Sequence, residues 1–183
     1  MIKSKTLTIR ELCLISLFTA IIAVCAQVSI PMPYGVPMTL QTLAIPLAGA
    51  VLGMKNGTIA ALVYVLLGLV GVPVFAGFSG GIGMLFGRTG GFILAFPLMA
   101  FTAGVGARSG KKLWLILWLV IGAIALYISG LTVFSIVTSS SPAASFMLVV
   151  VPFLPTEVIK IIIVVFLSNL IKHALRKRGI NND

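Results

Sequence analysis

Charge is scarce in this chain of 183 residues, and acidic charge is almost absent. Only 9% of the residues are charged, 13 of them basic and 3 acidic, whereas a soluble domain carries about 25%. Hydrophobic residues make up 60% of the chain, and the mean hydropathy is +1.21. Such a chain cannot cover a water-facing surface with polar groups, so its composition predicts an integral membrane protein. The basic residues lie at the ends of apolar runs, which argues against a nucleic-acid partner.

The residue types that enzymes and metal sites need are also scarce. The one histidine, His173, lies in a basic stretch, and the two cysteines, Cys13 and Cys25, belong to one predicted helix. They would lie about 18 Å apart, too far for a disulfide, and we expect both to be buried. The sequence holds no GxxxxGK[ST] loop and no cluster of carboxylates. We therefore predict that the chain is not an enzyme and binds no metal or cofactor.

Apolar runs bounded by charges, proline and glycine predict six transmembrane helices in a single membrane domain over residues 1–183. The predicted helices cover residues 12–30, 40–54, 58–72, 91–107, 113–137 and 147–174. The second and third are short and are joined by residues 53–57, which predicts a helical hairpin. The first run is nearer in length to a full span than to a signal peptide, so we expect a retained helix.

Basic residues gather on one side of the predicted membrane domain. Eleven of the 13 fall there: Lys3, Lys5, Arg10, Lys55, Arg108, Lys111, Lys112, Lys172, Arg176, Lys177 and Arg178. Because positively charged loops stay in the cytoplasm, an even number of spans places both termini there. The other side receives only Arg88 and Lys160, together with Glu157. We expect a multi-pass protein of the bacterial plasma membrane.

The three outer connections are too apolar for ordinary solvated loops. Residues 31–39 contain three prolines and form a stiff candidate lid, and residues 138–156 join the last two helices. Residues 73–90 are rich in glycine and carry three phenylalanines. Irregular backbone at membrane depth is tolerated where protein or a cavity receives it. The pattern predicts a compact all-α bundle with this glycine-rich loop folded into the mouth of a pocket, with Phe75, Phe78, Phe86 and Phe92 as candidates for its apolar wall.

Glu157, Lys160 and Arg88 are charges that need an explanation at the edge of an apolar bundle. Pro155 suits the first turn of a helix, where the helix dipole favours the Glu157 carboxylate. Lys160 follows three residues later and shares its face. One interpretation is an ion pair that anchors the last helix at the membrane interface. The other, which we favour, is a ligand site at the outer mouth, because Arg88 and the glycine-rich loop lie on the same side.

Small residues are frequent in the predicted helices, and Ser16 and Ala20 form a small-xxx-small pair on the first one. Small surfaces let helices pack closely in lipid. The pair predicts either packing inside the bundle or a docking face for another membrane subunit.

Several motifs, in order along the chain, resemble one family. They are residues 35–44 (GVPMTLQTLA), 47–53 (LAGAVLG), 64–76 (YVLLGLVGVPVFA), 87–92 (GRTGGF) and 155–160 (PTEVIK). This set is similar to the BioY family of biotin-specific substrate-binding (S) components of energy-coupling factor (ECF) transporters. The resemblance implies a six-helix S component that captures biotin from outside and works with a transmembrane coupling protein and two ATPases. It also implies that Ser16 and Ala20 contact the coupling protein.

The resemblance assigns Glu157 and Lys160 to the ligand site at the start of the sixth helix. Biotin offers two ureido N–H donors and one ureido oxygen, so Glu157 would accept from the first and Lys160 would donate to the second. The valeryl carboxylate would meet Arg88 or the backbone N–H groups of a short glycine-rich run. The full predicted ligand set is Glu157, Lys160, Arg88, Ser79, Gly80, Gly81, Phe75, Phe92, Tyr34 and Gln41.

Two residues depart from the family's usual GPTGGY motif: Arg88 stands in place of proline and Phe92 in place of tyrosine. The acid at Glu157 is more often aspartate. An S component for another small carboxylate or vitamin is therefore a second hypothesis, and a ligand-free membrane assembly subunit is a third.

Overall fold

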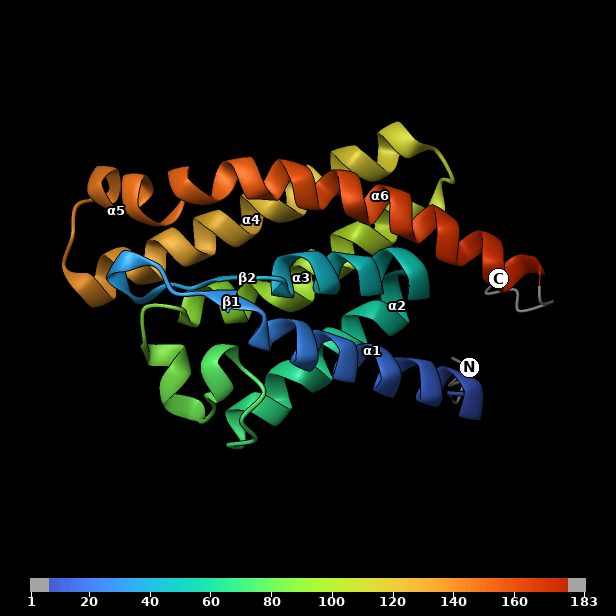
Figure 1. The fold of residues 1–183 in the computed structure, drawn as a ribbon, viewed down its shortest axis with the longest axis horizontal. Helices are drawn as coiled ribbons and strands as arrows, with labels where there is room; N and C mark the ends of the chain where they lie inside the picture. The colour runs from blue at the N-terminus through green and yellow to red at the C-terminus, as the bar shows by residue number, and fades with distance from the viewer. Residues whose placement is uncertain (1–6, 178–183) are drawn as a thin grey trace, which may run out of the picture.

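The computed structural model describes residues 7–177, which form an all-α bundle with one short two-stranded ribbon (Figure 1). The predicted basic residues Lys3, Lys5 and Arg178 lie outside the described residues. The elements in chain order are α1 (Ile9–Gln27), β1 (Ser29–Ile30), η1 (Pro33–Gly35), β2 (Met38–Thr39), α2 (Gln41–Leu69), η2 (Ala76–Phe78), η3 (Ile82–Phe86), α3 (Gly90–Arg108), α4 (Lys112–Thr138), α5 (Pro142–Val149), η4 (Val151–Phe153) and α6 (Leu154–Lys177).

Five helical segments within residues 7–177 are long and apolar enough to cross a membrane: α1, α2, α3, α4 and Pro142–Ala174. The all-α membrane architecture predicted from composition is therefore confirmed. Burial differs widely among these segments. In α3, 61% of the apolar window is buried, against 28% in α1 and in α4. Helix α3 is thus the centre of the bundle, while α1 and α4 turn most of their apolar surface outward, where lipid is the favourable solvent.

The α2 element reverses direction at Gly53, whose φ of 83° and ψ of 171° are not helical. Gly49 and Gly57 would lie about 12 Å apart on a straight helix. Instead a methyl group added at Gly57 would overlap the Gly49 backbone. The element is a tight hairpin of two arms, as the glycine pattern predicts. Its reversal takes a single residue, so the stretch predicted as a turn, residues 53–57, already belongs largely to the second arm.

Helix α1 begins and ends earlier than predicted. A capping box starts it: the Glu11 N–H donates to Thr8 Oγ1 over 3.2 Å, and the Thr8 N–H donates to Glu11 Oε2 over 2.8 Å. The helix stops at Gln27 because Ser29 and Ile30 pair with Thr39 and Met38 in the antiparallel ribbon. The expected burial of both cysteines is wrong, since Cys13 is exposed on the outer face of α1.

The third outer connection is not a loop. Ser141 caps α5, because its hydroxyl accepts from the Ala144 N–H over 3.3 Å, and Pro142 occupies the first helical position. Helix α5 and the η4 turn come before α6 and extend the last span outward, so that it covers Pro142–Ala174. The prediction of one helix over residues 147–174 missed this extension, which places the start of α6 inside the bundle instead of at its rim.

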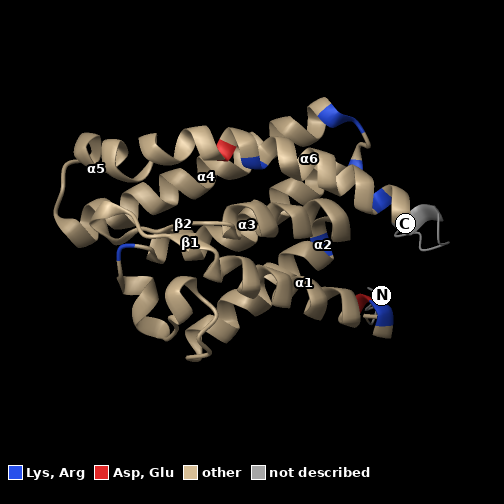
Figure 2. Ribbon diagram, viewed as in Figure 1, with Lys and Arg blue, Asp and Glu red and all other residues tan. Residues whose placement is uncertain are grey.

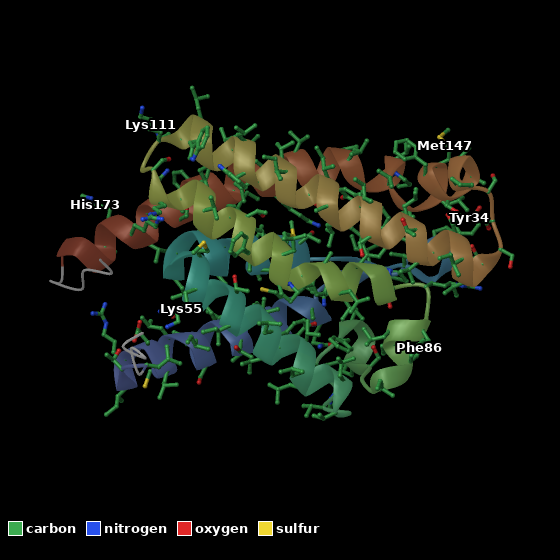
Figure 3. The ribbon with its side chains drawn as sticks, turned by 180° about the vertical axis from the view of Figure 1, so that it is seen from behind. Tyr34, Lys55, Phe86, Lys111, Met147 and His173 are labelled. Atoms are coloured by element: carbon green, nitrogen blue, oxygen red, sulfur yellow. The ribbon has the colours of Figure 1, made fainter. Side chains whose placement is uncertain are left out.

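The molecule has two chemically different ends. Figure 3 shows Tyr34, Phe86 and Met147 at one end and Lys55, Lys111 and His173 at the other. Figure 2 shows most basic residues at the second end, near which both described chain ends also lie. The ribbon and the short η2 and η3 turns lie at the first end, around the mouth of a cavity.

Candidate ligand cavity

A cavity of about 450 Å³ opens at the end of the bundle that carries the β1–β2 ribbon. That volume is in the range of small-molecule sites. Its walls come from seven parts of the chain: the ribbon connection, the first turn of α2, the glycine-rich connection, α3, α4, η4 and α6. The lining is mostly apolar, and its polar and charged side chains are Thr39, Gln41, Thr42, Arg88, Thr89, Tyr127 and Lys160.

Lys160 brings a buried positive charge to the cavity wall. Its side chain is only 7% exposed, and its Nζ donates to the Thr39 carbonyl over 2.8 Å and to Thr42 Oγ1 over 2.7 Å. These bonds tie α6 to the start of α2. An ammonium group has three N–H donors, so one remains for a group inside the cavity. The expected cation of the site is therefore present, and it is held deep in the bundle.

Glu157 lies one turn before Lys160 but behind the wall of the cavity. It is 5% exposed and is absent from the lining, where Tyr127 stands in its place. The Tyr127 hydroxyl donates to Glu157 Oε2 over 3.3 Å, and Oε1 has no hydrogen-bond partner among the described residues. The expectation of a carboxylate exposed at the outer rim is wrong, because α5 and η4 continue the protein beyond it. A buried carboxylate oxygen without a donor is costly, so this region is poised to accept another hydrogen bond.

Gln41 lines the cavity, and both the oxygen and the nitrogen of its amide bond to the protein. Its Oε1 accepts from Thr39 Oγ1 over 2.8 Å, and its Nε2 donates to the Tyr64 hydroxyl, which in turn donates to the Val74 carbonyl over 3.1 Å. This chain of bonds links the ribbon, both arms of α2 and the glycine-rich connection. Gln41 therefore shapes the pocket floor and holds Thr39, the acceptor of Lys160, in place.

Arg88 lies at the mouth and is exposed. Its Nη1 donates to the Tyr34 carbonyl over 3.1 Å, so it fastens the glycine-rich connection to the ribbon connection. The Tyr34 side chain is 54% exposed and does not line the cavity. Tyr34 thus contributes its backbone to the mouth, while the guanidinium keeps further donors for a ligand group that emerges there.

The apolar wall is built by some of the predicted phenylalanines and not by others. Phe75 and Phe92 line the cavity, and Phe92 packs edge-on against Tyr127 with ring centroids 6.4 Å apart. Phe78 and Phe86, which are 72% and 75% exposed, point away from it. Phe96 and Phe153 complete the wall. The glycine-rich connection thus lines the cavity through Phe75, Met84 and Arg88, while the side chains of Phe78 and Phe86 lie on the outer surface.

The backbone run Ser79, Gly80 and Gly81 does not line the cavity. The Gly81 N–H donates to the Gly68 carbonyl over 2.7 Å, and the Ser79 hydroxyl donates to the Ala76 carbonyl over 2.8 Å. Gly80 packs against the backbone at Val72. These groups hold the connection onto the end of α2, so the expectation that they bind a ligand carboxylate is not supported by their geometry.

Comparison with known proteins shows to which family the chain belongs. A model of the BioY family matches residues 1–177. The chain belongs to the BioY family. It is 40% identical over 151 residues to the "Probable biotin transporter BioY" of Pyrococcus horikoshii, covering 82% of this chain and 89% of that protein. It is 38% identical over 156 residues to the "Biotin transporter BioY2" of Lactococcus lactis subsp. cremoris, covering 84% and 85% of the two chains.

A solved structure shares the fold of this BioY chain. The crystal structure of the S-component for biotin from an ECF-type ABC transporter aligns with a TM-score of 0.82 at 26% identity, over 94% of this chain and 95% of that one. The likeness therefore extends over the whole bundle and includes both the cavity walls and the basic end.

Ser16 and Ala20 of this BioY chain lie side by side on the outer face of α1, and both are exposed. The opposite face of α1 carries Ile15, Phe18 and Ile22, which are buried in the core. Of the two readings of the small pair, packing inside the bundle is therefore excluded. The pair presents a shallow surface that a helix of another subunit can approach closely.

Sequence reasoning missed four polar residues of the cavity lining, Thr39, Thr42, Thr89 and Tyr127, and the apolar Phe96 and Phe153. Tyr127 had a signal, since it is the only tyrosine in an apolar run of 27 residues, where a buried phenol needs a hydrogen-bond partner. Thr39 and Thr42 flank Gln41 within the family-like motif at residues 35–44.

Proposed function

We propose that this BioY protein is the substrate-capture subunit of a biotin uptake transporter of the ECF type. The observation that carries the proposal is the whole-chain likeness to an S-component for biotin, together with relatives named as biotin transporters. Such a subunit binds and delivers its ligand without chemical turnover, and it resides in the plasma membrane as a multi-pass protein. Biotin would be its transported ligand, and no cofactor is required.

The cavity chemistry supports a bound orientation with the ureido ring deep and the valeryl chain toward the mouth. Lys160 would donate its remaining N–H to the ureido oxygen. The Tyr127 hydroxyl donates a hydrogen bond to Glu157, which strengthens the phenol oxygen as an acceptor for a ureido N–H. Phe75, Phe92 and Phe96 would pack on the thiophane ring. The valeryl carboxylate would then meet Arg88, which faces water at the mouth.

Isothermal titration of the purified full-length protein with biotin, biotinamide and desthiobiotin tests both ligand and orientation. We expect one tight site for biotin, with weaker binding of biotinamide because the amide cannot pair with Arg88. Absence of biotin binding would overturn the proposal. A panel of other vitamins tests the second hypothesis, motivated by Arg88 and Phe92, and tight binding of another small carboxylate in place of biotin would support it.

A ligand-free assembly subunit is the remaining alternative. The buried Lys160 and the Glu157 Oε1 atom, which has no hydrogen-bond partner within residues 7–177, argue against it, because ionisable groups inside a membrane bundle are costly and mark functional sites. If neutralising both residues left ligand binding and transport unchanged, the assembly role would be favoured.

The membrane arrangement we propose is a single domain of six helices, in which the two arms of α2 count separately and both termini are cytoplasmic. The concentration of lysine and arginine at one end supports that orientation. The ligand cavity would then open to the outside. Cysteine labelling at Phe86→Cys and Lys55→Cys in intact cells tests it, because only the first should react with an impermeant reagent.

Delivery would need an ATP-driven partner, since the chain has no phosphate-binding loop of its own. We propose a coupling protein with two ATPases, which docks on Ser16 and Ala20. An Ala20→Leu variant should lose co-purification with the coupling protein and keep its biotin affinity. Val24→Leu, on an exposed position of the same helix, is the matched control.

A further inference from the structure

A second cavity, of about 250 Å³, lies at the basic end of the bundle between α3, α4 and α6. Its lining carries the four cations Arg108, Lys111, Lys112 and Lys172, together with His173. No aspartate or glutamate among the described residues lines it. Figure 3 shows Lys111 and His173 at the end opposite Tyr34, so this cavity is remote from the biotin cavity. The cytoplasmic preference of basic residues accounts for their presence at this end, but not for the gathering of four cations around one cavity.

Backbone donors add to the positive character of this basic cavity. Helix α4 begins at Lys112, and no side chain caps its first turn. The first N–H groups of a helix point out of its end and favour an anion. Ser168 and Asn169 of α6 also line the cavity, and both side chains donate to the Val165 carbonyl, so the donors available to an anion are the cations and the α4 N–H groups. The cavity therefore matches a compact, oxygen-rich anion such as a phosphate group.

The surface beside the cavity is suited to lipid. Leu113 is 82% exposed and Trp114 is 45% exposed at the start of α4. Trp114 also stacks edge-on with Trp118, at 6.3 Å between centroids. Tryptophan concentrates at the depth of lipid headgroups, and α4 turns most of its apolar surface outward. A phosphate held in the cavity would thus have acyl chains running along α4.

We infer that the basic cavity between α3, α4 and α6 is a binding site for the headgroup of an anionic phospholipid. Lys111 and Lys112 would meet the phosphodiester at the opening. Arg108 supplies a planar donor fork suited to phosphate oxygens, and Lys172 donates to the Ala107 carbonyl over 3.3 Å, which fixes its position on the α3 side. Clusters of cations between membrane helices recognise anionic headgroups in this way.

Native mass spectrometry of delipidated full-length protein tests the inference, with titration of dioleoyl phosphatidylglycerol and dioleoyl phosphatidylcholine. We expect preferential retention of phosphatidylglycerol. Lys111→Gln/Lys112→Gln should weaken its retention about 30-fold, because each basic residue near an anionic surface contributes a factor of about five. Lys55→Gln, an exposed lysine outside the cavity, should change it less than about twofold. Equal retention of both lipids, or no effect of the double variant, would overturn the inference.

A competition experiment distinguishes a bound lipid from bound free phosphate. Inorganic phosphate or glycerol phosphate at the lipid's concentration should not displace phosphatidylglycerol, since neither has acyl chains to lie along α4. Displacement at equal concentration would overturn the lipid assignment in favour of a soluble anion. Matching elution and thermal unfolding of the double variant and the wild type would show that the variant is folded.

Discussion

The two cavities of this BioY protein hold positive charge in opposite ways. In the cavity that we propose binds biotin, called the biotin cavity below, one buried lysine is fixed by the Thr39 carbonyl and the Thr42 hydroxyl, and the remaining wall is mostly apolar. In the basic cavity four cations and a helix N-terminus gather around a small opening with no acid among the described lining residues. A buried charge held by fixed partners is suited to selecting one ligand. A group of cations at the membrane interface attracts anions of a general class.

The largest loss of biotin affinity should come from Lys160→Met, which keeps the volume of the side chain and removes its charge. Two charge-assisted hydrogen bonds and the donor for the ligand would be lost. A hydrogen bond to a charged group contributes about 1.5–3 kcal/mol, so biotin affinity should fall by roughly 100-fold.

Isothermal titration measures that loss. Lys55→Met, which removes an exposed charge, should bind biotin like the wild type. Wild-type affinity in Lys160→Met would show that the buried charge has no part in ligand capture.

The second prediction concerns the Glu157–Tyr127 pair. Tyr127→Phe removes the acceptor at the cavity wall, and Glu157→Gln weakens the bond that orients it. We expect each change to reduce biotin affinity about tenfold, with the double variant little worse than either one, because the two residues act as a unit.

A double-mutant cycle by titration measures this coupling. Additive losses would mean that Glu157 contacts the ligand independently. Tyr34→Phe is a control for the loss of a phenol hydroxyl outside the cavity, since the Tyr34 side chain is exposed and only its backbone carbonyl bonds to Arg88.

Hydropathy predicts the membrane helices. It does not predict which side chains line the cavity, because that depends on how the helices and their connections pack. The apolar runs and the glycine pattern at Gly53 predict helices and a hairpin because lipid requires every backbone group to be bonded internally. The depth of Glu157 was mispredicted because α5, started by Ser141 and Pro142, extends the protein beyond it. Lys160 was found because a charge in an apolar run has few explanations.

The glycine-rich connection shows more clearly how far the sequence alone predicts the residues of the site. Its composition predicts a pocket wall, and its two ends do line the cavity, at Phe75 and at Arg88. Its central N–H groups were expected to bind the ligand, but Gly81 donates to Gly68 instead. The packing of the connection against α2 decides which of its backbone N–H groups bond within the protein. That packing is a tertiary contact, which the local sequence does not encode.

A smaller effect is expected at the mouth of the biotin cavity. Arg88→Gln removes an exposed cation and weakens the bond to the Tyr34 carbonyl. Because water screens this charge, biotin should dissociate only about threefold faster. Biotinamide, which has no carboxylate, should dissociate at nearly the same rate from both proteins.

Stopped-flow measurement of ligand release provides the comparison. Equal acceleration for biotin and biotinamide would mean that Arg88 acts by closing the mouth and not by pairing with the carboxylate.

The smallest expected effect tests whether the two cavities are independent. Lys111→Gln/Lys112→Gln removes half of the cations that line the basic cavity, yet none of these residues contacts the biotin cavity. Energetic coupling between distant sites needs an element with two arrangements, and α3, the most buried of the spans, packs between the two ends as one continuous helix. Biotin affinity measured by titration in detergent should therefore change by less than about 1.5-fold. A larger change in phosphatidylglycerol nanodiscs than in phosphatidylcholine nanodiscs would reveal that the lipid and biotin sites communicate through α3, and the difference in affinity between the two lipids would measure that coupling directly.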